Sequence, residues 1–233
     1  MYLYETHCHT AASSKCASGS AEEIVDMYTA NGYSGVFITD HFLNGNTTVH
    51  DALPDGTFEE KAALFCEGYR KVKEAAQRAG RGLQVFFGLE YSYHGSDLLL
   101  YGWNEETLKR FPEILSLKTS EFIPFAKERG AFIVQAHPFR ERDYIDHIRL
   151  FTGAEGTEAC NACEDERSNF LAQTYAKAYD KPMTAGSDMH HPYVQKVLAG
   201  TAFETPLTDE ADFIARVRAG EGKIVRKQNV RAR

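Results

Sequence analysis

Short runs of apolar residues recur along the chain, each bounded by polar or turn-forming residues. Runs of this length that are rich in β-branched and aromatic residues predict buried strands. We expect strands at residues 1–6, 35–39, 83–89, 97–101, 131–136, 154–159, 183–186, 196–203 and 223–225. The run at 154–159 is the most polar of the set and carries Glu158 near its end.

The segments between these runs predict helices. Ser20 and Glu23 have the spacing of a capping box, which predicts the start of a helix that closes at Asn31-Gly32. Further helices are expected over 57–79, over parts of 105–130 with interruptions near Pro112 and Pro124, and over 143–150, 164–179 and 208–219.

Strands that alternate with helices predict an α/β fold with a parallel sheet. Six or more such units favour closure of the sheet into a barrel, and α/β barrels commonly reach the size of this chain, 233 residues with 43% hydrophobic composition. No low-complexity linker or fixed repeat divides the sequence. We therefore expect a single barrel domain over residues 1–233.

The charge balance excludes some classes of partner. The net charge is −7, and the basic residues form no block except a short C-terminal group, so no dedicated nucleic-acid surface is expected. An anionic substrate remains possible, because bound divalent cations would supply local positive charge. The sequence has no signal-peptide pattern and no apolar span of membrane length, and the odd number of cysteines, five, suits reduced thiols. We expect a soluble cytoplasmic protein that does not bind membranes. Cys160 and Cys163 are read as small residues after a strand and not as half of a zinc knuckle.

Metal-binding types of side chain follow five of the expected strands. They are His7 with His9, Asp40 with His41, Glu90, His137, and Asp188 with His190. In a parallel barrel the carboxyl ends of the strands share one face, so these side chains should meet there. So many imidazoles and carboxylates without a cation would repel one another or be half protonated. Nitrogen and oxygen ligands with few thiols suit zinc, manganese or iron.

These blocks, in this order and spacing, resemble the signature motifs of the PHP (polymerase and histidinol phosphatase) superfamily. They read His7-x-His9, Thr39-Asp40-His41, Gly88-Leu89-Glu90, Ala136-His137-Pro138 and Gly186-Ser187-Asp188-Met189-His190. The resemblance covers most of the chain and is strongest to small, stand-alone members, including histidinol-phosphatase-like proteins. It implies a distorted (β/α)7, TIM-like barrel that holds two or three divalent or transition metal ions and hydrolyses phosphoesters.

The resemblance also implies a ligand set. His7, His9, Glu90 and Asp188 would hold a first ion, Glu90 and His137 would share a second, and His41 and His190 a third. In two places the chain departs from the family pattern. The loop after the first block lacks the usual acidic residue or histidine, and Cys16 is the candidate replacement; a histidine usual after the glutamate block is also missing, and Asp97 or His94 lies nearby.

The expected activity is hydrolysis of a small phosphomonoester, such as histidinol phosphate or a nucleotide, by a metal-activated hydroxide. Asp188 or His190 would protonate the leaving group, and Arg140 and Arg142 would clamp the phosphate unless they are merely solvated loop residues. The alternatives are an amidohydrolase-type carbonyl hydrolase, which would prefer a metal-bridging lysine, and a non-catalytic metal-binding barrel. The sequence identifies neither the substrate nor the oligomeric state.

Overall fold

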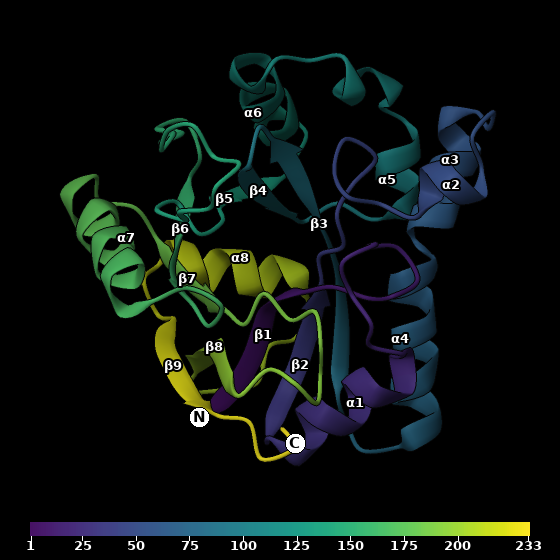
Figure 1. Cartoon of the computed structure of the whole chain (residues 1–233). Coiled ribbons are helices and arrows are strands. Elements are labelled where there is room, and N and C mark those ends of the chain that lie inside the picture. The colour runs from purple at the N-terminus through teal and green to yellow at the C-terminus, as the bar shows by residue number, and fades with distance from the viewer.

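The chain folds around a nine-stranded sheet that curls into a nearly closed barrel, and the computed structural model describes all of residues 1–233 (Figure 1). The strand order is β7-β6-β5-β4-β3-β2-β1-β8-β9. The strands are β1 (Tyr2–Cys8), β2 (Tyr33–Ile38), β3 (Gln84–Tyr93), β4 (Ser96–Tyr101), β5 (Phe132–Gln135), β6 (Gly156–Asn161), β7 (Met183–Gly186), β8 (Val197–Phe203) and β9 (Lys223–Gln228). The segment after β7 returns to β1, where Met189 exchanges backbone hydrogen bonds with His7 and His9. The predicted α/β barrel is confirmed.

The sheet is mixed, and the strands that precede the candidate ligand residues belong to its parallel parts. β1, β2 and β3 pair in parallel, as do β5, β6 and β7. β4 is antiparallel to both β3 and β5, so the two parallel groups point the same way, and β8 is antiparallel to β1. The carboxyl ends of six strands therefore meet on one face, as the barrel model requires.

β3 and β4 form a hairpin, which the sequence reading did not predict. Its turn is His94-Gly95, and both residues have positive φ, 50° and 78°. Two consecutive positive φ values are typical of the tight turn that best matches the twist of a hairpin. The hairpin pairs Ser92 with Asp97 and so brings Asp97 back to the same face as the end of β3.

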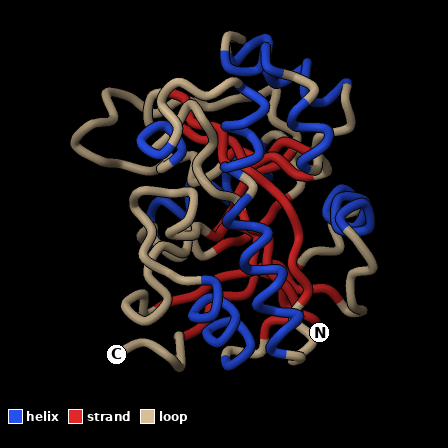
Figure 2. Tube along the Cα trace, turned by 90° about the vertical axis from the view of Figure 1, so that its right-hand side faces the viewer, coloured by secondary structure: helices blue, strands red, loops and turns tan.

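Most of the helices pack outside the sheet, whereas α8 crosses the middle of the molecule among the strands (Figures 1 and 2). The helices are α1 (Ala21–Ala30), α2 (Val49–Ala52), α3 (Phe58–Phe65), α4 (Glu67–Ala79), α5 (Glu105–Lys109), α6 (Thr119–Glu128), α7 (Glu166–Ala178) and α8 (Glu210–Arg218), with a 3-10 turn η1 (Pro112–Leu115). The predicted capping box of Ser20 and Glu23 is present at the start of α1. None of the helices is long and apolar enough to cross a membrane.

Three helix predictions need correction. The helix expected over 57–79 is broken at Cys66 into α3 and α4. α6 continues through Pro124, where an interruption was expected. Residues 143–150 form a loop and not a helix, because side-chain contacts hold this segment: Arg149 donates to the carbonyl of His94, and Gln135 donates to the carbonyl of Arg149.

Apolar side chains fill the inside of the barrel. One cluster joins residues of β1, β2, β3, β4, β5 and β8, among them Tyr4, Phe37 and Phe132, and it includes Phe213 and Val217 of α8. Two further clusters lie between the sheet and the outer helices. Buried polar groups are therefore concentrated where the strands end, and that is where the candidate site lies.

Candidate metal centre

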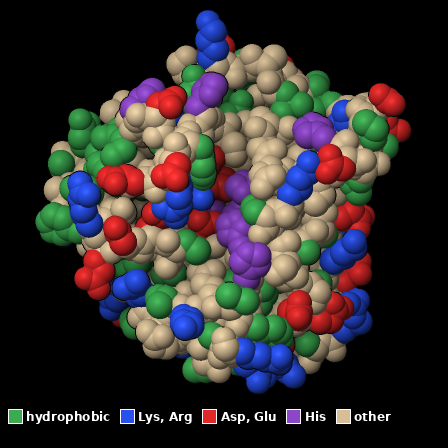
Figure 3. Space-filling view, in the orientation of Figure 1, with side chains coloured by type: hydrophobic (Ala, Val, Ile, Leu, Met, Phe, Trp, Pro, Cys, Tyr) green, Lys and Arg blue, Asp and Glu red, His purple; other side chains and the backbone are tan.

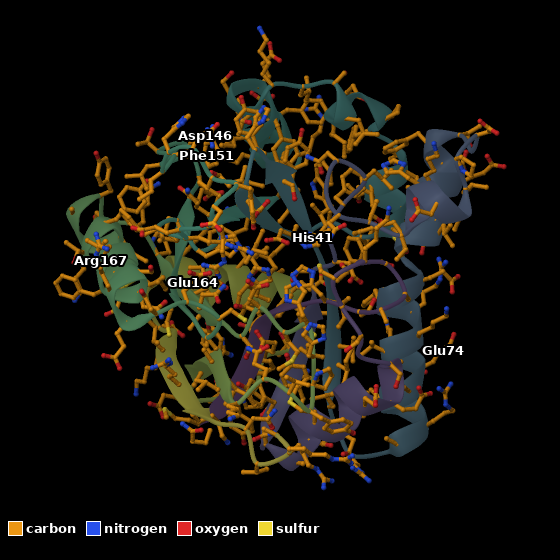
Figure 4. The ribbon with its side chains drawn as sticks, in the orientation of Figure 1. His41, Glu74, Asp146, Phe151, Glu164 and Arg167 are labelled. Carbon is orange, nitrogen blue, oxygen red and sulfur yellow. The ribbon has the colours of Figure 1, made fainter.

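The predicted ligand residues come together in a hollow on one face of the molecule. Figure 3 shows histidine side chains gathered at its middle with acidic and basic groups beside them, and His41 lies over the centre of the barrel in Figure 4. His7, Glu90 and Asp188 are almost fully buried, while His41 and His190 form the outer edge and are partly exposed.

The ligand atoms lie close together. His7 Nε2 is 3.3 Å from Glu90 Oε1 and 3.4 Å from Asp188 Oδ1, and His9 Nε2 is 3.3 Å from Asp188 Oδ1. His137 Nε2 is 3.4 Å from Glu90 Oε1, and His41 Nδ1 is 2.6 Å from Glu90 Oε2. Three groups each place three ligand atoms within 4.8 Å of one another: His7 with His9 and Asp188; His7 with Glu90 and His137; and His9 with His41 and His190.

The hydrogen bonding of these atoms fits bound cations. Nε2 of His7, Nε2 of His9 and Oε1 of Glu90 are buried and make no hydrogen bond. A buried polar atom without a partner costs about 1–3 kcal/mol, and more when it is charged. Cations held between these atoms would supply the missing partners, so the donor set suits metal binding.

Within the cluster, the carboxyl groups and the imidazoles shift one another's pKa values. Burial opposes the ionised forms of Glu90 and Asp188, but the neighbouring histidines outweigh it and hold the pKa of each carboxyl well below its usual range. Burial also opposes the charged form of His7, yet the carboxylates of Asp188, Glu158 and Glu90 together raise its pKa well above normal. The pKa of His9 is lowered by burial and then by His190 and His41. The site therefore favours ionised carboxylates.

Two of these residues leave their strands with left-handed backbone. His137 has φ 25° and Asp188 has φ 52°, a region that residues with a Cβ rarely adopt. Each lies just after a parallel strand, β5 or β7, so the unusual backbone turns its side chain inward over the barrel. Such strain persists only where surrounding contacts hold it.

Cys16 lies at the rim of the cluster. It is half-buried in the loop after β1 and borders the same cavity as His41 and His190. Burial alone would raise the pKa of its thiol, but hydrogen bonds with His190 and His41 outweigh burial and lower that pKa to about 6. This position is compatible with Cys16 as the replacement for the acidic residue or histidine that is usual in this loop.

Asp40 holds the loop that carries Cys16. Its carboxylate accepts hydrogen bonds from the backbone N–H of Thr10 at 2.6 Å, from Thr10 Oγ1 at 2.8 Å and from Ser14 Oγ at 2.7 Å. Gly68 of α4 allows this arrangement, since a Cβ there would lie 2.3 Å from Thr10 Oγ1 and 2.4 Å from an Asp40 oxygen. Asp40 therefore orders the loop and does not point at the ligand cluster.

The two candidate arginines differ in their surroundings. Arg142 donates to both oxygens of Glu164, at 2.7 and 3.2 Å. The guanidinium of Arg140 lies over the cluster instead, with Nη1 3.4 Å from His137 Nε2 and 4.0 Å from Asp188 Oδ2, and its buried Nε has no hydrogen-bond partner. Arg140 is thus available to an anion, whereas Arg142 is held by a carboxylate.

A cavity of about 490 Å³ opens directly outside the cluster. Besides His41, His190, Cys16 and Arg140, its lining includes Asn44, Asn46, Ser92, His94, Asp97 and Tyr144. Asp97 lies 3.7 Å from His137 Nε2, and burial, then Glu90, raises the pKa of its carboxyl. The hairpin turn thus brings both residues considered for the missing histidine, Asp97 and His94, to the cavity.

Glu158 and Asn161 on β6 also belong to the site, although the sequence reading gave them no role. Glu158 Oε1 lies 3.0 Å from His7 Nδ1, and Asn161 Nδ2 donates to Glu158 Oε2 at 2.9 Å. The signal in the sequence was an acidic residue, Glu158, inside an expected strand. It was missed because this strand looked weak and polar.

Comparisons with known proteins agree with this geometry. The family model described as "PHP domain" matches residues 5–181, and the one described as "PHP-associated" matches residues 166–221. No curated protein sequence matches the chain.

Among solved structures, a two-domain protein from Bacteroides vulgatus containing a predicted PHP-like metal-dependent phosphoesterase is similar, with a TM-score of 0.68, 13% identity and 96% of this chain covered. The match spans 64% of that protein's length. PsfC from Pseudomonas syringae has a TM-score of 0.62, 15% identity and coverage of 97% of this chain and 91% of that one. An amidohydrolase from Chromobacterium violaceum, with bound sulfate and no metal, has a TM-score of 0.50, 14% identity and coverage of 81% and 88%. At these identities the likeness concerns the fold.

Proposed function

The chain belongs to the PHP domain family, and from that premise we propose that it is a metal-dependent phosphoesterase that hydrolyses a small phosphomonoester. One observation carries the proposal. Buried ligand atoms of His7, His9 and Glu90 that make no hydrogen bond converge beside a cavity that the guanidinium of Arg140 lines, with its Nε free of any hydrogen bond. A cation cluster beside a guanidinium suits a substrate with several anionic oxygens.

The proposed ligands form three overlapping groups. His7, His9 and Asp188 would hold one ion, His7, Glu90 and His137 a second, and His9, His41 and His190 a third, with Cys16 at the edge of the last group. Bound divalent ions would supply Lewis acidity and a water of lowered pKa. Zinc, manganese and iron all suit these donors, and a thiolate from Cys16 would favour zinc or iron.

Arg140 is the proposed phosphate-binding residue. Its guanidinium can donate two parallel hydrogen bonds to phosphoryl oxygens and shield charge that develops on them. Arg142 is the second candidate, and its pairing with Glu164 supports a role in holding the loop that carries Arg140. Glu164 Oε1 also lies 3.8 Å from Arg140 Nε. Because this oxygen already accepts a hydrogen bond from Arg142, it competes less strongly with a substrate for Arg140.

His190 is the proposed proton donor to the leaving alkoxide in protein in which it does not hold the third ion. Its Nδ1 lies 2.8 Å from the backbone carbonyl of Asp188, a contact that favours a proton on Nδ1 and orients the ring at the cavity edge. Burial works against the charged ring, but Cys16 and Asp188 outweigh it and raise the pKa of His190. Asp188 has a lowered pKa and stays ionised, so it suits a cation better than proton donation.

The cavity favours a small, polar leaving group. At about 490 Å³ it is in the range of small-molecule sites, and its wall consists mainly of amides, hydroxyls and charged groups. Asn44 donates to the carbonyl of Ser92, which fixes one side of the cavity. A sugar phosphate or a nucleotide offers the hydroxyls and heteroatoms that such a wall can bind, whereas a purely apolar ester does not.

The carbonyl-hydrolase alternative lacks its expected residue, since no lysine lines the cavity. The Chromobacterium structure shares the fold with this chain, and that likeness does not extend to the reaction. The non-catalytic alternative does not account for an open cavity and for an arginine at its wall whose buried Nε makes no hydrogen bond. Cytoplasmic location and a single domain over 1–233 stay predictions.

The test is a substrate panel on metal-loaded protein. Sugar phosphates, nucleoside monophosphates, histidinol phosphate, phosphodiesters and simple amide or lactone substrates should be compared with zinc, manganese and iron in turn. We expect turnover of at least one phosphomonoester that disappears on chelation and returns with metal. Turnover of only amides or lactones would establish the carbonyl-hydrolase alternative, and metal binding without any turnover would favour the non-catalytic one.

A further inference from the structure

The end of β6 places a fully buried carboxylate behind the metal centre. Glu158 has none of its surface exposed, and no lysine or arginine pairs with it. Instead its two oxygens face residues that come from other strands. Oε1 lies 3.0 Å from Nδ1 of His7, and Oε2 accepts the backbone N–H of His137 at 3.0 Å.

The contact with His7 determines which of its ring nitrogens faces the metal centre. A carboxylate can only accept, so the His7 nitrogen beside Glu158, Nδ1, carries a proton. Nε2 is then the nitrogen directed at Glu90 and Asp188, at 3.3 and 3.4 Å. A carboxylate in this position also makes the imidazole a better electron donor through Nε2.

The contact with His137 supports strained backbone. His137 has φ 25°, and its N–H points into the protein, where Glu158 is its acceptor. Without that acceptor, the N–H would be buried and unpaired, and the conformation would cost more than it already does. Glu158 therefore acts on two ligand-bearing residues at once.

Asn161 extends the network toward Asp188. Its Nδ2 donates to Glu158 Oε2 at 2.9 Å and lies 3.5 Å from Asp188 Oδ2. Asn169 of α7 fixes Asn161 in turn, by accepting its N–H at 2.7 Å and donating to its carbonyl at 3.0 Å. The backbone of Asn161 is therefore held by α7 and not by the metal centre itself, and its side-chain oxygen accepts the N–H of Cys163 at 2.8 Å.

The packing leaves no room for this arrangement to relax. Gly186 pairs with Asn161 across β6 and β7, and a Cβ at Gly186 would lie 2.6 Å from His7 Cβ and 2.8 Å from Glu158 Oε1. A glycine is needed at this position because His7 and Glu158 approach the backbone so closely.

We propose that Glu158 is a positioning residue that fixes the ring of His7 and the backbone of His137 for metal binding, with Asn161 holding its second oxygen. The inference rests on the metal centre proposed above, but not on the identity of the substrate. It gives β6, which supplies no ligand, a defined part in the site.

The test compares Glu158→Gln with Glu155→Gln in the full chain. Glu155 precedes β6 and pairs with Arg218 at 2.9 Å, so its variant makes the same chemical change away from the ligands. In competition with a chromophoric chelator, Glu158→Gln should bind Zn²⁺ about 10- to 100-fold more weakly, whereas Glu155→Gln should match the wild type. With saturating Co²⁺, the visible spectrum of Glu158→Gln should also change, because the geometry around His7 changes; a general loss of stability would not alter that spectrum.

Zn²⁺ affinity within about twofold of the wild type together with an unchanged Co²⁺ spectrum in Glu158→Gln would overturn the inference. A second measurement needs no variant and covers the case in which Glu158→Gln does not fold. In the ¹⁵N spectrum of Zn²⁺-loaded wild type, His7 should keep a proton on Nδ1; zinc bound to Nδ1 would refute the proposal. Wild-type protein that binds no Zn²⁺ would instead refute the proposed metal centre itself, so the two failures are distinguishable.

Discussion

Arg140 provides the sharpest test of phosphoester chemistry. Replacing Arg140 by alanine removes the guanidinium that faces the cavity and leaves every proposed ligand in place, because arginine does not bind these metals. Only about a fifth of the Arg140 side chain is exposed, so its charge is weakly screened. We expect a loss in kcat/KM on the best phosphoester without a loss of bound metal.

The size of that loss follows from the surroundings of Arg140. A charge pair at about 4 Å is worth roughly 4 kcal/mol at an effective dielectric of about 20. Desolvation of both partners reduces the net value, so we expect about 2–4 kcal/mol, a roughly thirty- to thousandfold drop in kcat/KM. Arg140→Lys should recover only part of it, since an ammonium keeps the charge but cannot donate in parallel to two oxygens.

Steady-state kinetics on Arg140→Ala, Arg140→Lys and Arg142→Ala, with metal content measured on the same samples, form the assay. Arg142→Ala is the matched control, because Arg142 is held by Glu164. The loss in kcat/KM of Arg142→Ala should be several times smaller than that of Arg140→Ala. It should arise only because the carboxylate of Glu164, no longer bound by Arg142, attracts Arg140. Arg140→Ala with kcat/KM within about threefold of the wild type would refute the reasoning, as would equal losses in the two alanine variants.

The remaining predictions concern the ligands and the rim. Elemental analysis after metal-supplemented expression should find two or more transition-metal ions per chain, and less than one would contradict the overlapping ligand groups. His7→Ala, Glu90→Ala and Asp188→Ala should each remove nearly all activity and lower metal content with an unchanged far-ultraviolet circular dichroism spectrum; wild-type turnover in any of them would mean that the site is elsewhere. In metal-free protein, iodoacetamide should alkylate Cys16 at a rate that rises between about pH 5 and 7 and then levels off, because the thiolate form is complete above its pKa of about 6. Peptide mass spectrometry locates the label, and a rate at Cys16 that rises only above about pH 8 would refute the lowering of its pKa by His190 and His41.

The sequence by itself located the barrel strands and the residues that gather at their ends. This was possible because the signals are local: a short apolar run predicts a buried strand, and the residue that follows it emerges at the strand's end. His7, Glu90 and Asp188 could be placed on one face from this rule alone, and the capping box at Ser20 marked the start of α1.

Some local signals failed where tertiary contacts outweighed them. Residues 143–150 have the composition of a short helix, yet hydrogen bonds between Arg149 and His94 and between Gln135 and Arg149 hold them as a loop. The antiparallel hairpin of β3 and β4 depends on two left-handed residues, His94 and Gly95. Only Gly95 is of a type that predicts such a turn from the sequence.

Only the tertiary structure distinguished Arg140 from Arg142 and revealed Glu158. The two arginines are two residues apart in one loop, and nothing in the sequence tells that Glu164, from beyond β6, binds Arg142. Glu158 is separated from His7 by 151 residues, and their contact exists only because β7 carries Gly186 between them. Strand-end positions follow from the local chain, whereas the partner of each buried charge is determined by which strands and loops the closed barrel brings together.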